Sequence, residues 1–177
     1  MKSTVRLKRM SLCVYRFGVA VGIVSTTIAV LRWFVIDNPN WLPPTIASYV
    51  KPGTLTYMHR LAGFFIELIP LAAALYTLAA LHRICTAYCR GEVFGPTSGT
   101  CYRKFGTGLV LLGAANGLYT TLVIGAFSLL NEKKEFIIAL GLSTADLYLL
   151  VVGCAVMMLG IVMDEAYRIH DENAQIV

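Results

Sequence analysis

Four long apolar runs separated by short polar segments dominate the pattern along the chain. The runs cover about residues 14–36, 57–83, 105–130 and 136–163. About 20 apolar residues are enough to cross the hydrocarbon core of a bilayer as an α-helix. The pattern predicts an all-α integral membrane four-helix bundle, with residues 1–177 as a single transmembrane domain and 164–177 as a tail. We expect an uncleaved first span rather than a signal peptide, because the apolar core is long and no small-residue cleavage site follows.

Basic residues indicate which side of the membrane each connecting segment faces. Residues 1–16 hold five lysines and arginines and residues 83–104 hold four, whereas residues 37–56 hold only Lys51. Cytoplasmic segments of membrane proteins are enriched in these residues. We therefore expect both termini and the 83–104 loop in the cytoplasm. The outer 37–56 loop, rich in proline and aromatic residues, is expected to hold a short interfacial segment near Thr45–Val50.

The composition changes the picture mainly by excluding other classes of protein. Of the 177 residues, 57% are hydrophobic and 14% are charged, whereas ordinary soluble domains carry about 25% charged residues. A soluble enzyme, a disordered chain and a nucleic-acid module are all disfavoured. The net charge of +5 follows from the orientation in the membrane, so no direct contact with nucleic acid is expected. The five cysteines are an odd number and are expected to be mostly reduced thiols.

Polar side chains within the apolar runs are the first candidates for function. Glu67 and Asp146 each lie about ten residues from the predicted outer end of their run, which corresponds to about 15 Å of helix. Asn116 and Tyr119 lie at a similar level, and Pro70 is expected to kink the helix beside Glu67. Intramembrane carboxylates are costly and often functional. The favoured interpretation is that both are protonated, or hydrogen-bonded to Asn116 or Tyr119, and hold the bundle together. A proton or cation site and a ligand or partner contact remain alternatives.

Metal and haem binding are considered because donor side chains gather near the end of the second run. His82, Cys85 and Cys89 share roughly one helical face, and Cys101 would complete a tetrahedral zinc site. The paired Cys-x2-Cys spacing of standard zinc modules is missing, so these four are weak candidates. His59 and His82 lie 23 residues apart, about 35 Å along a helix, and cannot share one haem. With no catalytic motif either, we expect no cofactor and no enzyme.

Two segments carry a family resemblance. They are Arg60-Leu-Ala-Gly-Phe-Phe-Ile-Glu67-Leu-Ile-Pro70-Leu and the loop Tyr88-Cys-Arg-Gly91-Glu92-Val93-Phe94. Together with the tail Asp171-Glu172-Asn173 and the final Val177, they resemble the bacterial membrane family catalogued as domain of unknown function 2975 over about residues 56–177. The resemblance implies a four-span inner-membrane protein without an assigned activity. Some members are encoded beside a small helix–turn–helix regulator, which implies a cytoplasmic regulator as partner.

Two functional hypotheses follow. The first is a non-enzymatic interaction or regulatory protein of the bacterial inner membrane, which docks its regulator on the 164–177 tail and on a cytoplasmic loop centred on Arg90, Gly91, Glu92 and Phe94. Gly91 would end the second helix, because glycine readily adopts the left-handed conformation. The second is a small ion- or proton-coupled transporter subunit that uses Glu67 and Asp146. Four helices make a thin transporter, so that hypothesis would require a homo-oligomer.

Overall fold

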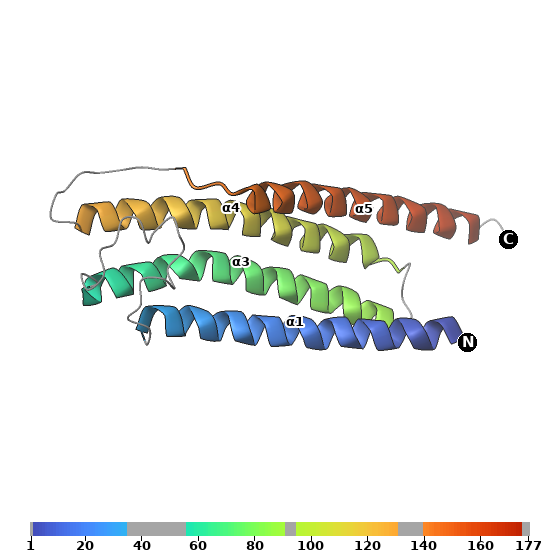
Figure 1. The fold of residues 1–177 in the computed structure, drawn as a ribbon. Coiled ribbons are helices and arrows are strands. Elements are labelled where there is room, and N and C mark those ends of the chain that lie inside the picture. Colours follow the sequence, from blue (N-terminus) through green and yellow to red (C-terminus); the bar gives the residue numbers. More distant parts are fainter. Residues whose placement is uncertain (1, 35–55, 91–94, 131–139, 175–177) are drawn as a thin grey trace.

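The computed structural model describes residues 2–34, 56–90, 95–130 and 140–174. Within these ranges it contains four long helices, labelled as in Figure 1: α1 (Lys2–Phe34), α3 (Tyr57–Arg90), α4 (Ser98–Leu130) and α5 (Thr144–Ala174). The expected all-α fold is therefore confirmed. The interfacial segment expected near Thr45–Val50 lies outside the described residues.

All four helices are long and apolar enough to cross a membrane. The candidate spans are Ser11–Phe34, Tyr57–Arg90, Ser98–Ser128 and Thr144–Asn173. Large apolar side chains stand on their surface with more than half of their area exposed, among them Phe17, Phe65, Val151 and Met158. A water-soluble protein rarely presents so much apolar surface. The chain thus has the length and composition of a multi-pass membrane protein with four spans.

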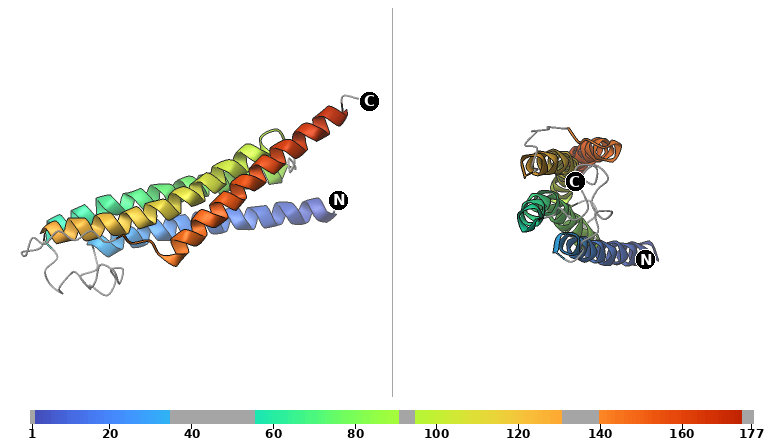
Figure 2. Two further views of the ribbon diagram at one scale, coloured as in Figure 1. Left: turned by 90° about the horizontal axis from the view of Figure 1, so that it is seen from above. Right: turned by 60° about the vertical axis from the view of Figure 1, so that its left-hand side comes forward.

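The helices pack in chain order as an open row. In the described residues, α1 packs against α3, α3 against α4, and α4 against α5. Figure 1 shows α1 and α5 at opposite edges of this row, and the left view of Figure 2 shows that α5 crosses the direction of the other helices at an angle. The start of α1 and the end of α5 lie at one end, called here the terminal end of the row. The predicted bundle is therefore open, with α1 contacting only one helix extensively.

Glycines bring α4 and α5 into backbone contact. A Cβ atom at Gly106 would lie 2.6 Å from the carbonyl oxygen of Gly153, and one at Gly160 would lie 2.7 Å from that of Gly99. Membrane helices approach closely where small residues line the interface. Gly153 and Gly160 lie seven residues apart, on one face of α5, and they pack against Gly106 and Gly99 of α4.

The fourth helix begins later than the apolar run does. Residues 140–143 are not helical, and α5 starts at Thr144 beside the middle of α4 (Figure 1). The reason is a capping box: the hydroxyl of Ser143 accepts from the backbone N–H of Asp146 at 3.3 Å, and the Asp146 carboxylate accepts from the N–H of Ser143 at 2.9 Å. The expectation of a helix from about residue 136 is wrong at residues 140–143; residues 136–139 lie outside the described part.

Candidate functional site

Glu67 is held by two side chains from the last turn of α1. Nη1 of Arg32 donates to Oε1 of Glu67 at 3.2 Å, and the indole Nε1 of Trp33 donates to Oε2. The Glu67 and Arg32 side chains are 14% and 24% exposed. The two side chains form a charge-assisted hydrogen bond, the stronger kind of hydrogen bond in proteins. Glu67 is thus hydrogen-bonded to neighbouring side chains, but its partners are Arg32 and Trp33 and not the expected examples Asn116 and Tyr119.

A glycine on α3 allows the Trp33 ring to reach this position. A Cβ atom at Gly63 would lie only 2.1 Å from Cη2 of Trp33, so the indole lies directly against the α3 backbone. The ring is 2% exposed and belongs to the central apolar cluster with Tyr119, Val123 and Phe127. A buried indole needs a partner for its N–H, and the Glu67 carboxylate supplies it. The packing of α1 on α3 and the ion pair therefore depend on one another.

Asp146 has a different role from Glu67. It lies in the first turn of α5, where its Oδ2 accepts from the backbone of Ser143 and its Oδ1 accepts from Nδ2 of Asn116 at 3.1 Å. The side chain is buried, with 5% of the residue exposed. A carboxylate in the first turn also suits the positive end of the helix dipole. Asn116 is confirmed as a hydrogen-bond partner, but the expected position about ten residues inside a helix is wrong.

A pocket of about 260 Å³ connects most of the expected polar residues. It lies between α1, α3 and α4, and its polar lining is Ser25, Arg32, Glu67, Asn116 and Tyr119. Asp146 reaches this group only through Asn116, which both lines the pocket and donates to Asp146. Sequence reasoning missed Arg32 as the partner of Glu67. The signal was the position of Arg32 in the sequence, one residue before Trp33 and near the end of α1, the helix that packs against the Glu67 helix α3.

Two polar atoms at this pocket have no partner among the described residues. They are Nε of Arg32 and the hydroxyl of Tyr119, both buried within the protein. Tyr119 is 8% exposed. Buried polar groups normally find a hydrogen-bond partner, often an ordered water. The pocket can therefore hold water or another small polar molecule beside a charge-neutral Arg32–Glu67 pair.

The weak metal candidates are spread over separate contacts. His82 packs its ring against Tyr15 with centroids 4.5 Å apart, Cys85 is buried, and Cys89 lies with its sulfur 3.5 Å from the Ser11 hydroxyl oxygen. Cys101 belongs to another helix, α4. Across the four described ranges, no three or more His, Cys, Asp or Glu residues are grouped so that they could hold a metal ion.

At the terminal end of the row, α5 extends beyond α4. Nη2 of Arg103, near the start of α4, lies 3.0 Å from Oδ2 of Asp164. Beyond this ion pair α5 continues to Ala174 as an exposed helix (Figure 1). Arg168 bridges Glu165 at 2.6 Å and Glu172 at 3.6 Å along that extension.

The expected docking loop is described only at its first residue. Arg90 ends α3 with an exposed side chain. Gly91, Glu92 and Phe94 lie outside the described residues. The extension of α5, in contrast, is described as far as Ala174.

Comparison with known proteins adds one match. The family model described as "Protein of unknown function (DUF2975)" matches residues 25–177. This match confirms the resemblance drawn from the segments around Glu67 and Gly91. No curated protein and no solved structure matches the chain significantly.

Proposed function

The chain belongs to the DUF2975 family, whose function is unknown, and we propose for it a role that rests on the charged extension of α5. The protein is a non-enzymatic interaction or regulatory protein of the bacterial inner membrane, with both termini in the cytoplasm. It binds a small cytoplasmic helix–turn–helix regulator. The observation that carries this proposal is the preformed charged helix that α5 extends past the start of α4.

The charge of this extension suits a nucleic-acid-binding partner. From Asp164 to Ala174 it holds four acidic residues, Asp164, Glu165, Asp171 and Glu172, and one arginine, Arg168, for a formal charge of −3. A helix–turn–helix regulator carries a basic surface for DNA phosphates. An acidic helix attracts that surface and competes with DNA for it. Because the helix is already formed, binding loses little conformational entropy.

The orientation proposed here rests on the distribution of basic residues. Residues 1–16 hold five lysines and arginines, and residues 83–104 hold four. The described parts of both segments belong to the end of the row at which α5 also ends. By the positive-inside rule this end faces the cytoplasm, which is where a soluble regulator would meet the tail.

The test begins with the gene neighbourhood, in which we expect a small helix–turn–helix regulator. We expect the purified regulator to bind the detergent-solubilised protein, as measured by biolayer interferometry. Asp171→Asn combined with Glu172→Gln should weaken binding at least tenfold at low salt. Opposite charges across an interface speed association, and closely paired ones also slow dissociation. The matched control is Glu132→Gln with Glu135→Gln, in the segment between α4 and α5, which should bind normally.

Two outcomes would reject this function. One is a gene neighbourhood without any helix–turn–helix regulator. The other is unchanged binding by the Asp171/Glu172 variant and by a chain that stops after Asp164. That truncation keeps the Arg103–Asp164 ion pair, so loss of its binding would reflect loss of the tail. A Glu92→Gln, Phe94→Ala variant tests the loop separately.

A small ion- or proton-coupled transporter subunit is the second candidate function. It is favoured by the pocket that places Glu67 beside Asn116 and the unpartnered Tyr119 hydroxyl. The engagement of Glu67 by Arg32 and of Asp146 by the α5 cap favours a structural role instead. Proton flux into proteoliposomes should distinguish the two, since Glu67→Gln would abolish flux in a transporter. A folded Glu67→Gln protein with an unchanged cellular phenotype would reject this candidate.

A further inference from the structure

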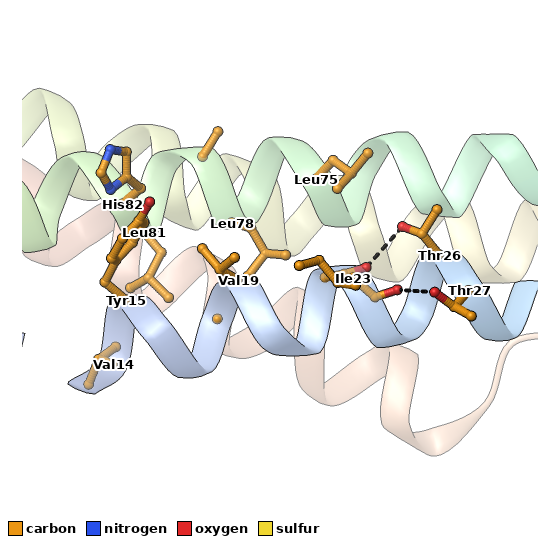
Figure 3. Close-up of a pocket in the computed structure, with 13 residues that line it drawn as sticks. Val14, Tyr15, Val19, Ile23, Thr26, Thr27, Leu75, Leu78, Leu81 and His82 are labelled. Carbon is orange, nitrogen blue, oxygen red and sulfur yellow. Dashed lines mark hydrogen bonds between the residues drawn. The ribbon is translucent and has the colours of Figure 1, made fainter. Parts of the chain in front are cut away.

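A long groove runs between α1 and α3, from Val14 to Thr27 on α1 and from Leu75 to His82 on α3. Figure 3 shows its walls, which include Tyr15, Val19, Ile23, Leu78 and Leu81, and its volume is about 520 Å³. Thr26 and Thr27 line the groove, but their hydroxyl groups are already engaged in hydrogen bonds. Each donates to its own helix, to the carbonyls of Gly22 and Ile23, at 2.9 Å in both cases. The groove surface is therefore almost entirely apolar.

Two glycines of α1 create the groove. Gly18 and Gly22 both line it, and neither carries a side chain to fill the space beside α3. A Cβ atom at Gly18 would lie 3.4 Å from Cδ2 of Leu78, and one at Gly22 would lie 3.0 Å from Cδ1 of the same leucine. Because α1 is the edge helix of the row and packs mainly on α3, no other described helix covers the opening.

The groove has the length of one bilayer leaflet. Tyr15 and His82 stack at its terminal end, with ring centroids 4.5 Å apart, and Arg16 and Arg83 follow them in the chain. These arginines are the charged residues nearest to the stack in the sequence, and the candidate spans continue past them to Ser11 and Arg90. From Arg16 to Thr27 an ideal helix rises about 16 Å. Half of a typical hydrocarbon core is about 15 Å.

Two positive charges stand one residue beyond the Tyr15–His82 stack in the sequence and indicate an anionic occupant. The Arg16 and Arg83 side chains are exposed, and neither forms an ion pair with a described acidic residue. Guanidinium groups at the membrane surface attract anionic lipid headgroups. A second copy of the chain docked here about a two-fold axis would bring the same arginines towards their own copies. Like charges in one interface disfavour that arrangement.

We propose that this groove is a binding site for an anionic phospholipid. One acyl chain lies along the apolar floor formed by Gly18 and Gly22, and the phosphate lies between Arg16 and Arg83. Tyr15 and His82 mark the boundary between chain and headgroup. This lipid completes the packing of the edge helix α1 and is independent of the regulator proposed for the tail.

The acyl-chain part is tested by filling the groove. Ala79 lines the groove and is exposed, so Ala79→Trp adds a large ring without overpacking the core. Ala72 is the matched control, because it is exposed on the same helix, two turns away and outside the groove. Native mass spectrometry of protein delipidated and then incubated with dioleoylphosphatidylglycerol should show one retained lipid. Retention should fall at least tenfold in Ala79→Trp and stay unchanged in Ala72→Trp.

The headgroup part is tested by removing charge. Arg16→Gln with Arg83→Gln should reduce the preference for phosphatidylglycerol over phosphatidylcholine by about fivefold for each arginine. Lys104→Gln, an exposed cation at the same end but on α4, should leave that preference unchanged. Since the arginine variant needs no repacking, it keeps the test valid if Ala79→Trp fails to fold.

Three results would overturn the proposal. Equal lipid retention in Ala79→Trp and Ala72→Trp would place the lipid elsewhere. Equal retention of the two lipids by the unmodified protein would remove the role of the arginines. A change of oligomeric mass in Ala79→Trp without any retained lipid in the unmodified protein would make the groove a contact between copies.

Discussion

Replacing Gly63 with alanine should disrupt the contact between α1 and the Glu67 site. The new methyl group would lie 2.1, 2.3 and 2.5 Å from three carbons of the Trp33 ring. Ordinary carbon–carbon contacts are about 3.5–4.0 Å, so the ring must retreat by more than an ångström. It has little room, because Val123 and Phe127 in the same cluster are 0% and 4% exposed. The retreat also draws the indole N–H away from the Glu67 carboxylate.

The expected loss of stability is the sum of two contributions. Overpacking of a filled core costs about 1–3 kcal/mol, and the rigid, buried ring places Gly63→Ala in the upper half of that range. An interhelical hydrogen bond in a membrane contributes about 0.6 kcal/mol on average, and about 1.7 at most. Alanine gains about 0.5–1 kcal/mol over glycine in a helix. The net destabilisation is therefore about 2–3 kcal/mol.

Gly22→Ala is the matched control. It replaces another helical glycine, but its Cβ atom would meet only Cδ1 of Leu78 at 3.0 Å, beside an open groove. The end of a leucine side chain can rotate away, so the change in the free energy of unfolding should stay within about 0.5 kcal/mol. Both variants would be unfolded reversibly in mixed micelles of increasing dodecyl sulfate content. Loss of helix would be followed by circular dichroism, which serves every variant, and the fluorescence of Trp33 and Trp41 gives a second signal where Trp33 is kept.

An equal effect of the two glycine variants would refute this reasoning. A double-mutant cycle gives a second check, because Trp33→Leu removes the ring that the alanine would strike. The cost of Gly63→Ala should then fall by at least about 1 kcal/mol, since residues in contact are not additive. Additive effects would mean that the methyl group is accommodated without moving Trp33.

Two further predictions concern α5. Asp146→Ala removes the acceptor for Ser143 and Asn116 and should destabilise the protein by about 1 kcal/mol or more, as the loss of a helix cap does. Amide hydrogen exchange in the first turn of α5 should become faster, whereas Asp146→Asn should preserve most of the protection. Gly106→Leu should separate α4 from α5, because its Cβ atom would lie 2.6 Å from the carbonyl oxygen of Gly153, a backbone atom that cannot rotate away. In the same micelle assay it should destabilise more than Gly22→Leu, and a smaller effect would contradict the close approach of these backbones.

Helix starts were less predictable than the helices themselves. Apolar residues continue through 136–142, so hydropathy alone extended the fourth helix to about residue 136. The start at Thr144 depends on the Ser143–Asp146 capping box, which is a local hydrogen-bond pattern rather than a hydropathy signal. That pattern is visible in the sequence as Ser-x-x-Asp and would have moved the predicted start towards Thr144.

The partners of the polar residues depended on how the helices are arranged side by side. Asn116 and Asp146 are polar residues at similar predicted depth, and the structure joins them. Glu67 was expected to bond in the same way, yet Arg32 and Trp33 occupy its oxygens. That outcome depends on the order of helices in the row and on the flat contact of Trp33 with Gly63. Neither is visible in the hydropathy of a single helix.

The sequence by itself determined the four apolar helices, and it carries the small residues at which α4 and α5 approach each other. These features follow from local composition, because lipid favours any uninterrupted apolar helix and small residues permit close approach wherever they lie. Only the tertiary structure decided that the helices form an open row, that Glu67 meets Arg32, and that a groove remains beside Gly18 and Gly22. The physical reason is that lipid chains are as apolar as the helix surfaces, so they favour no helix pair over another. The choice depends on the fit of particular side chains, such as Trp33 against Gly63.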